Sequence, residues 1–290
     1  MSLLGDSLRG IFFENDCLSA VLYLSSPLPP SKGWAKKLCQ SPPCPITMLK
    51  LFKKTTAPLA DFSMLGADLH SHLLPGIDDG APDLETSLEL IQALQGLGFQ
   101  RIFTTPHVMS DMYPNSRNQI LRKRDEVQEA IEELGLEVEF DAAAEYYLDP
   151  SFAEMLKGEA LLTLPGNRVL VEMSFYQPYR ELHRIIFDLQ MKGYHPILAH
   201  PERYPYYQTS EDYENLKAMG CALQVNLLSL TGYHGKPIQT AAKTILGLGL
   251  ADFLATDLHH ARHAANLQQA LSHELVVKTM QKSVFQNSLM

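Results

Sequence analysis

The feature that most constrains the fold is an alternation of short apolar runs with amphipathic stretches from residue 66 to residue 273. The runs are rich in Val, Ile, Leu, Phe and Ala, which is typical of parallel strands buried on both faces. Pro and Gly mark several boundaries of the helical patterns between them. We expect strands over 66–70, 100–105, 137–144, 168–173, 195–200, 221–226 and 252–257, and helices from Pro82 to Gly98, from Pro114 to Gly135, and over 178–192, 211–218, 236–247 and 263–273.

An α/β chain with this alternation can form an open doubly wound sheet or a closed barrel, and the pattern alone does not separate the two. The polar residues do. Histidines and acidic residues lie at or just after the ends of five expected strands, namely His70, His107, Glu145, His200 and Asp257. The carboxyl ends of the strands of a β/α barrel converge on one rim, whereas an open sheet spreads them along a line. We therefore expect a barrel.

The composition bounds the class of protein. A chain of 290 residues, 46% hydrophobic and 20% charged, suits one large domain with or without an appendage. The net charge of −9 argues against a nucleic-acid partner, and no apolar stretch is long enough to suggest membrane insertion. The four cysteines form no disulfide framework, which favours a cytoplasmic setting. Cys221, in an apolar run, is expected to be buried and structural. A monomer and a homo-oligomer both stay open.

The first 47 residues differ from the rest, because much of this segment is rich in Ser, Pro and Lys without periodicity. We expect residues 1–47 to be a non-native or disordered extension, with Met48 as the true start. Residues 48–65 would then be a linker and residues 66–290 the folded domain. The alternative is a signal peptide. It would be a poor one, because acidic residues precede its apolar segment where a signal peptide carries positive charge. The intact mass of protein made from its native locus separates the two.

Two short motifs stand at the start of the domain. His70 and His72 are two residues apart on a strand end, so both imidazoles project to one face and can reach one ion or two adjacent ions. A chance pair of surface histidines explains this spacing equally well. The loop Pro75–Gly80 carries Asp78 and Asp79, and a plain turn would account for it alone. The loop begins three residues after the histidines, so it lies close to them.

The remaining strand ends carry the same kinds of side chain, namely His107, Glu145, His200, and the pair Asp257 and His259. Each one alone could be a capping or surface group. Together, imidazoles and carboxylates without thiolate suit Mn, Fe, Zn or Co. Seven or eight ligands exceed the need of one ion, so two or three metals sharing a bridging carboxylate are expected. Such a cluster ionises a bridging water, binds phosphate oxygens and neutralises a leaving group, which fits hydrolysis of a phosphate ester.

These motifs, in this order, resemble the PHP (polymerase and histidinol phosphatase) superfamily over roughly residues 66–273. The resemblance is closest to the manganese-dependent protein-tyrosine phosphatases of bacterial capsule and exopolysaccharide loci. It rests on the strings His70-Ser71-His72-Leu73-Leu74-Pro75-Gly76-Ile77-Asp78-Asp79-Gly80, Thr105-Pro106-His107 and His200-Pro201-Glu202-Arg203-Tyr204. It implies an α/β fold, a distorted TIM-like (β/α)7 barrel of the PHP type, with a trinuclear site occupied by Mn²⁺.

The resemblance also implies roles for single residues. One ion would be held by His70, His72, Glu145 and Asp257; a second by His107, His200 and the bridging Glu145; the third by Asp79 and His259. Asp79 stands where other branches of the superfamily use a histidine. Arg203 would bind the substrate phosphate, because its planar fork suits bidentate recognition.

The last motif departs from the family pattern. The family often has Asp-Ala-His-Asn followed by an Arg, whereas here Asp257-Leu258-His259-His260-Ala261-Arg262-His263 is found. Arg262 is a candidate for a second phosphate contact, although its register differs. His260 and His263 are expected at the surface or at a helix start rather than as ligands.

The implied reaction is attack of ionised water on phosphorus with departure of tyrosine phenolate, and Asp78 is a candidate acid for that leaving group. The implied substrate is a phosphotyrosine protein, the tyrosine-rich tail of a capsule-type kinase. Tyr204, Tyr206 and Tyr207 would line the mouth of the site or pack under a loop. Two alternatives stay open: a phosphatase of a small metabolite such as histidinol phosphate, and a non-catalytic metal-binding regulatory module.

Overall fold

The computed structural model describes residues 57–158 and 160–290. The expected extension 1–47 and the first part of the expected linker lie outside these residues. The strands are β1 (Ala67–Asp68), β2 (Arg101–Thr104), β3 (His107–Val108), β4 (Glu139–Ala142), β5 (Glu145–Tyr147), β6 (Arg168–Glu172), β7 (His195–Ala199), β8 (Ala222–Asn226) and β9 (Ala251–Ala255). The α-helices are α1 (Leu84–Gly96), α2 (Arg117–Leu134), α3 (Pro150–Gly158), α4 (Leu182–Met191), α5 (Ser210–Ala218), α6 (Leu227–Thr231), α7 (Lys236–Gly247), α8 (Ala261–Ala270) and α9 (Glu274–Lys282).

All strand pairs are parallel, in the orders β1-β2-β4 and β3-β5-β6-β7-β8-β9. The two sheets are one continuous wall, because β3 prolongs β2 and β5 prolongs β4. Pro106 interrupts the first of these strands, since proline has no N–H for the ladder. Pairing continues across the breaks, where the Ala143 N–H donates to Thr104 O (2.9 Å) and the Glu145 N–H to Pro106 O (3.1 Å).

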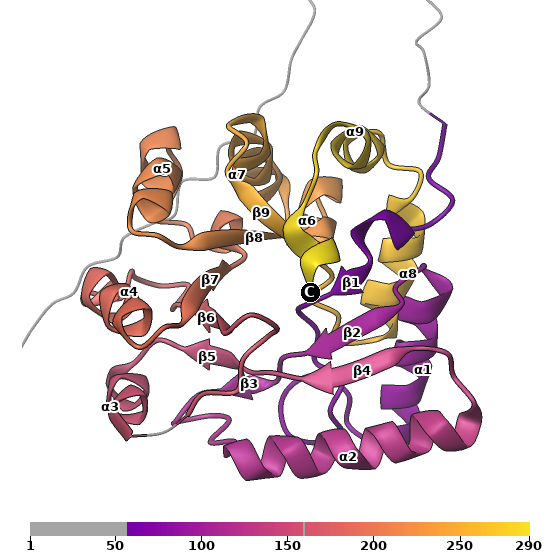
Figure 1. The fold of residues 1–290 in the computed structure, drawn as a ribbon. Coiled ribbons are helices and arrows are strands. Elements are labelled where there is room, and N and C mark those ends of the chain that lie inside the picture. Colours follow the sequence, from indigo (N-terminus) through magenta and orange to yellow (C-terminus); the bar gives the residue numbers. More distant parts are fainter. Residues whose placement is uncertain (1–56, 159) are drawn as a thin grey trace, which may run out of the picture. The chain divides into compact units, whose positions relative to one another are not determined.

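The wall closes where the first strand meets the last. The Asp257 N–H donates to His70 O at 2.8 Å, and the His72 N–H donates to Leu258 O at 2.9 Å. Strands therefore form a closed ring, with helices placed around it (Figure 1). The expected distorted (β/α)7 barrel is confirmed, and each of the seven expected strands is found within about three residues of its expected bounds.

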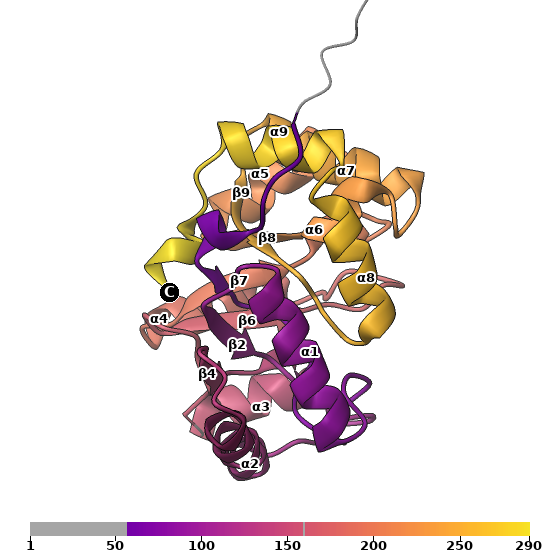
Figure 2. The same cartoon turned by 90° about the vertical axis from the view of Figure 1, so that its right-hand side faces the viewer.

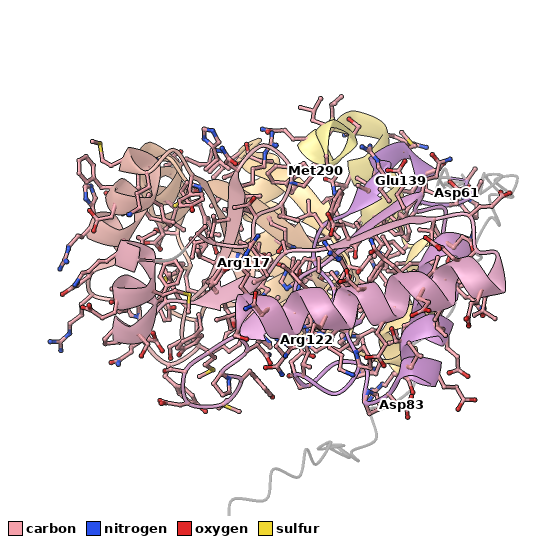
Figure 3. All side chains as sticks on the ribbon, turned by 60° about the horizontal axis from the view of Figure 1, so that its bottom comes forward. Asp61, Asp83, Arg117, Arg122, Glu139 and Met290 are labelled. Atoms are coloured by element: carbon pink, nitrogen blue, oxygen red, sulfur yellow. The ribbon has the colours of Figure 1, made fainter. Side chains whose placement is uncertain are left out.

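Helix α2 illustrates why these segments are helical. The Ser116 side chain accepts a hydrogen bond from the Gln119 N–H at the start, and Gly135 ends the helix with φ +65°. Arg117 and Arg122 lie on its exposed side near the first turns (Figure 3). Its buried face packs over the barrel wall through Ile120, Val127 and Ile131. Helices α1 and α8 pack against each other on another side (Figure 2). No helix in the described ranges has the length and apolarity that a membrane span requires.

The structure departs from expectation in two short strands, β3 and β5, in three helices and in one boundary. Helices α3, α6 and α9 were not predicted. The helix expected over 263–273 is α8, which ends at Ala270, and α9 begins at Glu274. The described part of the expected linker is not a free connector, because Phe62 is fully buried and its ring stacks on Phe99 with centroids 6.0 Å apart. The packed domain therefore begins before residue 66.

The C-terminal segment lies beside β1 (Figures 1 and 2). The buried Asn287 side chain donates to Ala67 O (3.0 Å) and Leu254 O (2.7 Å) and accepts from the Leu254 N–H (3.1 Å). These bonds tie the first residue of β1 to Leu254 in the second half of β9. His70 and Asp257, two of the candidate ligands, lie further along the same two segments.

Candidate metal centre

Glu145, the first residue of β5, lies at the middle of the site. Its side chain is buried, and its Oε2 is 3.2 Å from His70 Nε2, 3.4 Å from His72 Nε2 and 3.1 Å from His107 Nδ1. Its Oε1 is 3.3 Å from His200 Nε2. These five residues come from four strands far apart in the chain. The barrel therefore brings the expected ligands together around one carboxylate.

The other expected ligands adjoin this centre. Asp257 Oδ1 lies 3.4 Å from His70 Nε2 and 3.4 Å from His259 Nδ1. Asp79 is half-exposed, and its Oδ1 is 3.5 Å from His107 Nε2 and 3.6 Å from His259 Nε2. All eight expected metal ligands thus lie in one cluster, in which His107 faces Glu145 with one nitrogen and Asp79 with the other.

Hydrogen bonds orient three of the imidazoles. Nδ1 of His70 lies 2.9 Å from Gln224 Oε1, Nδ1 of His72 lies 2.8 Å from Asp78 Oδ2, and Nδ1 of His259 lies 3.0 Å from Asp257 O. Since each of these partners is an acceptor, we assign the ring N–H to Nδ1. The lone pair of Nε2 is then free to bind a cation, the arrangement usual for histidine ligands in metalloproteins.

Two of the ligand positions have a strained backbone. His200 has φ +33° and Asp257 has φ +50°, in the left-handed region that non-glycine residues rarely adopt. His200 also precedes Pro201, and a residue before proline is usually extended. Such conformations cost on the order of 1–3 kcal/mol each and are concentrated at functional sites. Here the strain accompanies the delivery of both side chains into the cluster.

Glu172, the last residue of β6, is a site residue that the sequence pattern did not single out. Its Oε2 is 3.7 Å from His107 Nδ1 and its Oε1 is 3.7 Å from His200 Nε2. Burial, and then the negative charge of Glu145, raise the pKa of Glu172 well above its ordinary value. The same criterion that identified the other ligands, an acidic residue at a strand's carboxyl end, would have found it in the expected strand 168–173.

The charge distribution suits a cation. Although burial raises the pKa of Glu145 and Asp257, the histidines around them hold both pKa values well below normal. Burial lowers the pKa of His200 and of His259 to about 4, so these imidazoles are neutral at neutral pH. Burial lowers the pKa of His70 and of His72, but the neighbouring carboxylates outweigh burial and raise both pKa values, so a bound cation would replace a proton on these two rings. The anionic carboxylates and the neutral His200 and His259 are already in the protonation states that metal ligands require.

The donor set also fits in space. Glu145 Oε1 and His200 Nδ1 are buried and make no hydrogen bond within the described residues. Ligand atoms lie within 4.8 Å of one another in four overlapping groups: His72, Asp79, His107 and His259; His70, His72 and Glu145; His70, His200 and Asp257; and His107, Glu145 and Glu172. Nitrogen and carboxylate oxygen without sulfur is a donor set for Mn, Fe or Zn.

Asp78 has a different role from its neighbour Asp79. Its carboxylate is buried, pairs with His72, and accepts the N–H groups of Gly80 (3.0 Å) and His107 (3.1 Å). Burial raises its pKa, but His72 and these donors outweigh burial and lower the pKa to about 2. This arrangement argues against the expected role of Asp78 as an acid and indicates that it positions His72. Gly80 makes the tight loop sterically feasible, because a Cβ there would collide with the His72 carbonyl oxygen.

A cavity of about 380 Å³ opens above the cluster. Arg203 lines it, with Nη1 2.8 Å from Asp257 Oδ2 and its guanidinium 4.9 Å from the centre of the Phe175 ring. Besides the expected ligands, its wall also contains Glu172, Tyr233, His234, His260 and His263. Arg203 therefore borders the same cavity as the expected metal ligands.

The remaining expected residues are placed as follows. Arg262 is exposed and outside the cavity wall, and its guanidinium lies 5.7 Å from the centre of the Tyr233 ring. His260 is the N-cap of α8, as expected, although it also borders the cavity. Tyr204 is fully buried and its hydroxyl accepts the Met173 N–H, so it packs rather than lining the mouth. The free Cys221 is buried, as expected.

Comparisons with known proteins give the family. Residues 66–289 match the family described as capsular polysaccharide synthesis, CpsB/CapC. The chain is 29% identical to tyrosine-protein phosphatase YwqE of Bacillus subtilis over 202 residues, 67% of this chain and 78% of that protein. It is 28% identical to tyrosine-protein phosphatase CpsB of Streptococcus pneumoniae over 200 residues, 67% of this chain and 82% of that one.

A solved structure shows the same similarity. A chain from the crystal structures of Bacillus subtilis YwqE and Streptococcus pneumoniae CpsB, described as metal-dependent tyrosine phosphatases, aligns with a TM-score of 0.66 and 27% identity, over 74% of this chain and 90% of that chain. The family match spans the barrel and every ligand of its candidate metal centre. The chain therefore belongs to the CpsB/CapC family of capsular polysaccharide synthesis.

Proposed function

We propose that this protein is a metal-dependent protein-tyrosine phosphatase that acts in the control of capsule or exopolysaccharide synthesis. The observation that carries the proposal is Glu145 among four imidazoles, beneath a cavity that also holds the Arg203 guanidinium. Side chains suited to bind cations and a guanidinium suited to bind phosphate thus border the same space, which supports the proposal. The tyrosine phosphatases YwqE and CpsB among its relatives support the substrate class.

We assign the metal ligands as the resemblance to the family implies, and we add Glu172 because it lies near His107 and His200. His70, His72, Glu145 and Asp257 would hold one ion; His107, His200, Glu145 and Glu172 a second; Asp79 and His259 a third. The proposed metal is Mn²⁺, in two or three copies, with Fe or Zn as the alternatives that share these ligands. When bound, such ions lower the pKa of water and neutralise charge on phosphate oxygens.

The chain's own residues supply orientation and charge. Arg203 would bind the phosphate with the guanidinium nitrogens that are not bonded to Asp257, while Asp257 and Phe175 hold the group in place. Asp78 and Gln224 keep the rings of His72 and His70 turned toward the centre. Among the described residues the only cysteine is Cys221, which is buried and does not border the cavity, so it is not positioned to act as a nucleophile.

The proposed physiological substrate is a phosphotyrosine protein, the tail of a bacterial tyrosine kinase, and the proposed location is the cytoplasm. An exposed tail can reach a cavity at the end of a barrel without rearrangement of the barrel. A small metabolite such as histidinol phosphate remains the rival substrate.

The test is metal analysis of the purified protein alongside parallel assays on a phosphotyrosine peptide and on histidinol phosphate. We expect bound metal and faster hydrolysis of the peptide. His107→Ala should lose more than tenfold in activity, since removal of a ligand perturbs the centre directly. The control is His183→Ala, which changes an exposed histidine on α4. Equal activity of the two variants, or a preference for histidinol phosphate, would refute the proposal.

A further inference from the structure

We propose that a hollow beside the catalytic cavity is a specificity subsite for a bulky apolar side chain next to the phosphotyrosine of the substrate. This inference rests on the proposed function. The hollow, hereafter the side groove, has a volume of about 440 Å³. Its apolar wall is formed by Phe175, Pro205, Pro237 and Ile238, and Arg203 and His234 lie where it meets the cavity.

The side groove is continuous with the catalytic cavity. Phe175, Arg203 and His234 line both hollows. A phosphate bound to Arg203 therefore lies at the junction between them. Consecutive Cα atoms of a peptide are about 3.8 Å apart, so the residue next to the phosphotyrosine must lie at the rim of the cavity. The side groove is the hollow that adjoins the rim at Phe175, Arg203 and His234.

A second hollow also touches the cavity, but it suits such a side chain less well. It shares Tyr233 with the cavity and is lined by polar residues that include Asn266 and Gln269. It has neither the exposed aromatic ring nor the paired prolines of the side groove. The two hollows thus define two exits for a peptide, and the apolar one is the side groove.

The wall of the side groove is prearranged. The Phe175 ring is 37% exposed, yet it is held by the Arg203 guanidinium at 4.9 Å and by the His200 ring at 5.8 Å. Prolines have little conformational freedom to lose, and Ile238 lies in the first turn of α7. A surface that is already ordered loses little entropy when it binds, so it can discriminate among side chains.

Two charged groups of the side groove have partners within the protein, although Glu202 Oε2 is buried without a hydrogen-bond partner among the described residues. Nη1 of Arg203 is bonded to Asp257 Oδ2 at 2.8 Å. Glu202 is buried beneath the groove, where its Oε1 accepts the Asn226 N–H at 2.9 Å. The exposed apolar surface of Phe175, Pro237 and Ile238 is therefore the feature that remains for recognition. A leucine-like or aromatic side chain fits it better than a glycine.

The experiment uses the full-length, metal-loaded protein and four substrates. These are p-nitrophenyl phosphate and three phosphotyrosine peptides, with glycine on both sides, leucine before, or leucine after the phosphotyrosine. We expect kcat/KM of one leucine peptide to exceed that of the glycine peptide by about tenfold, the effect of filling an apolar subsite. In Ile238→Ser and Ile238→Ala this preference should fall below threefold. Hydrolysis of p-nitrophenyl phosphate should be unchanged in both variants, which also verifies that they fold.

Two controls make the outcome decisive. Leu248→Ser removes an apolar side chain that is 40% exposed at the other end of α7, and Gln269→Ala alters the second hollow; both should keep the preference. Equal kcat/KM on all peptides in the unmodified protein, or a preference lost in Gln269→Ala and kept in Ile238→Ser, overturns the inference while the phosphatase function stands. Absence of hydrolysis of every phosphotyrosine peptide overturns the proposed function and this inference with it.

Discussion

Replacement of Asp78 by asparagine tests whether this residue positions a metal ligand or acts as an acid. The carboxylate is buried, lies 2.8 Å from His72 Nδ1, and accepts the N–H groups of Gly80 and His107. An asparagine side chain at this position would keep an acceptor oxygen but lose the negative charge. The change therefore removes the charge-assisted part of the contact with His72 while leaving the size of the side chain nearly unchanged.

The magnitude follows from the pKa of Asp78. It is lowered from 3.8 to about 2, roughly two units at about 1.4 kcal/mol each. The ionised carboxylate thus stabilises the metal-free fold by on the order of 2–3 kcal/mol. Since the folded-state pKa is the lower one, this stability is present above pH about 4 and is lost as the pH falls toward 2.

Asp78→Asn in metal-free protein should therefore lower the free energy of unfolding by about 2 kcal/mol at pH 7. The difference in unfolding free energy between the variant and the unmodified protein should shrink as the pH falls from 4 to 2. Urea unfolding followed by circular dichroism measures both. In metal-loaded protein the metal affinity should fall by about 10- to 100-fold, as for other partners of histidine ligands.

The same variant distinguishes the two roles by kinetics. An acid matters most for a poor leaving group, so its loss would slow a phosphotyrosine peptide far more than p-nitrophenyl phosphate, at unchanged metal affinity. A positioning residue should affect both substrates alike, and added metal should restore part of the rate. Unchanged stability and metal affinity, together with a selective loss on phosphotyrosine, would refute the positioning role of Asp78.

Three further predictions concern other side chains. Glu172→Gln should lower the ratio of bound metal to protein after dialysis, because a charged carboxylate ligand is lost; an unchanged ratio would count against its assignment. Arg203→Lys should lower kcat/KM on phosphotyrosine peptides by about a hundredfold at unchanged metal content, because a point charge replaces a planar fork; a loss of metal instead would indicate a structural role. Burial raises the pKa of Cys221 to about 12, so its peptide should escape iodoacetamide at pH 8 in folded protein and react in urea. Cys221→Ser should retain activity, and inactivation would contradict hydrolysis without a cysteine nucleophile.

Part of the site was predictable because each ligand occupies a recurring position in the chain. Five ligand candidates could be selected without any knowledge of contacts, because parallel strands deliver their carboxyl ends to one rim. They are His70, His107, Glu145, His200 and Asp257. The same reasoning would have reached Glu172. It was missed because a lone acidic residue at a strand end has no neighbouring motif to set it apart.

Other features depend on contacts that no local pattern encodes. Asp78 and Asp79 are adjacent and chemically alike, yet the loop turns one toward His72 and leaves the other half-exposed beside His107 and His259. Gln224 orients His70 across 154 positions of sequence. Partners this distant become neighbours only when the barrel closes.

The sequence by itself predicted the alternation of strands and helices and most ligand candidates, because periodicity, turn residues and side-chain chemistry are local properties. The barrel was inferred from the shared position of polar residues at strand ends, and the ligand role of Asp79 from the resemblance to the family. Only the tertiary structure decided which residue supports which ligand. It placed Tyr204 in the core and Arg262 outside the cavity wall, and it put strain at His200 and Asp257. The physical reason is that hydrogen-bond partners, burial and pKa values are set by which segments pack together, and packing is a property of the whole fold.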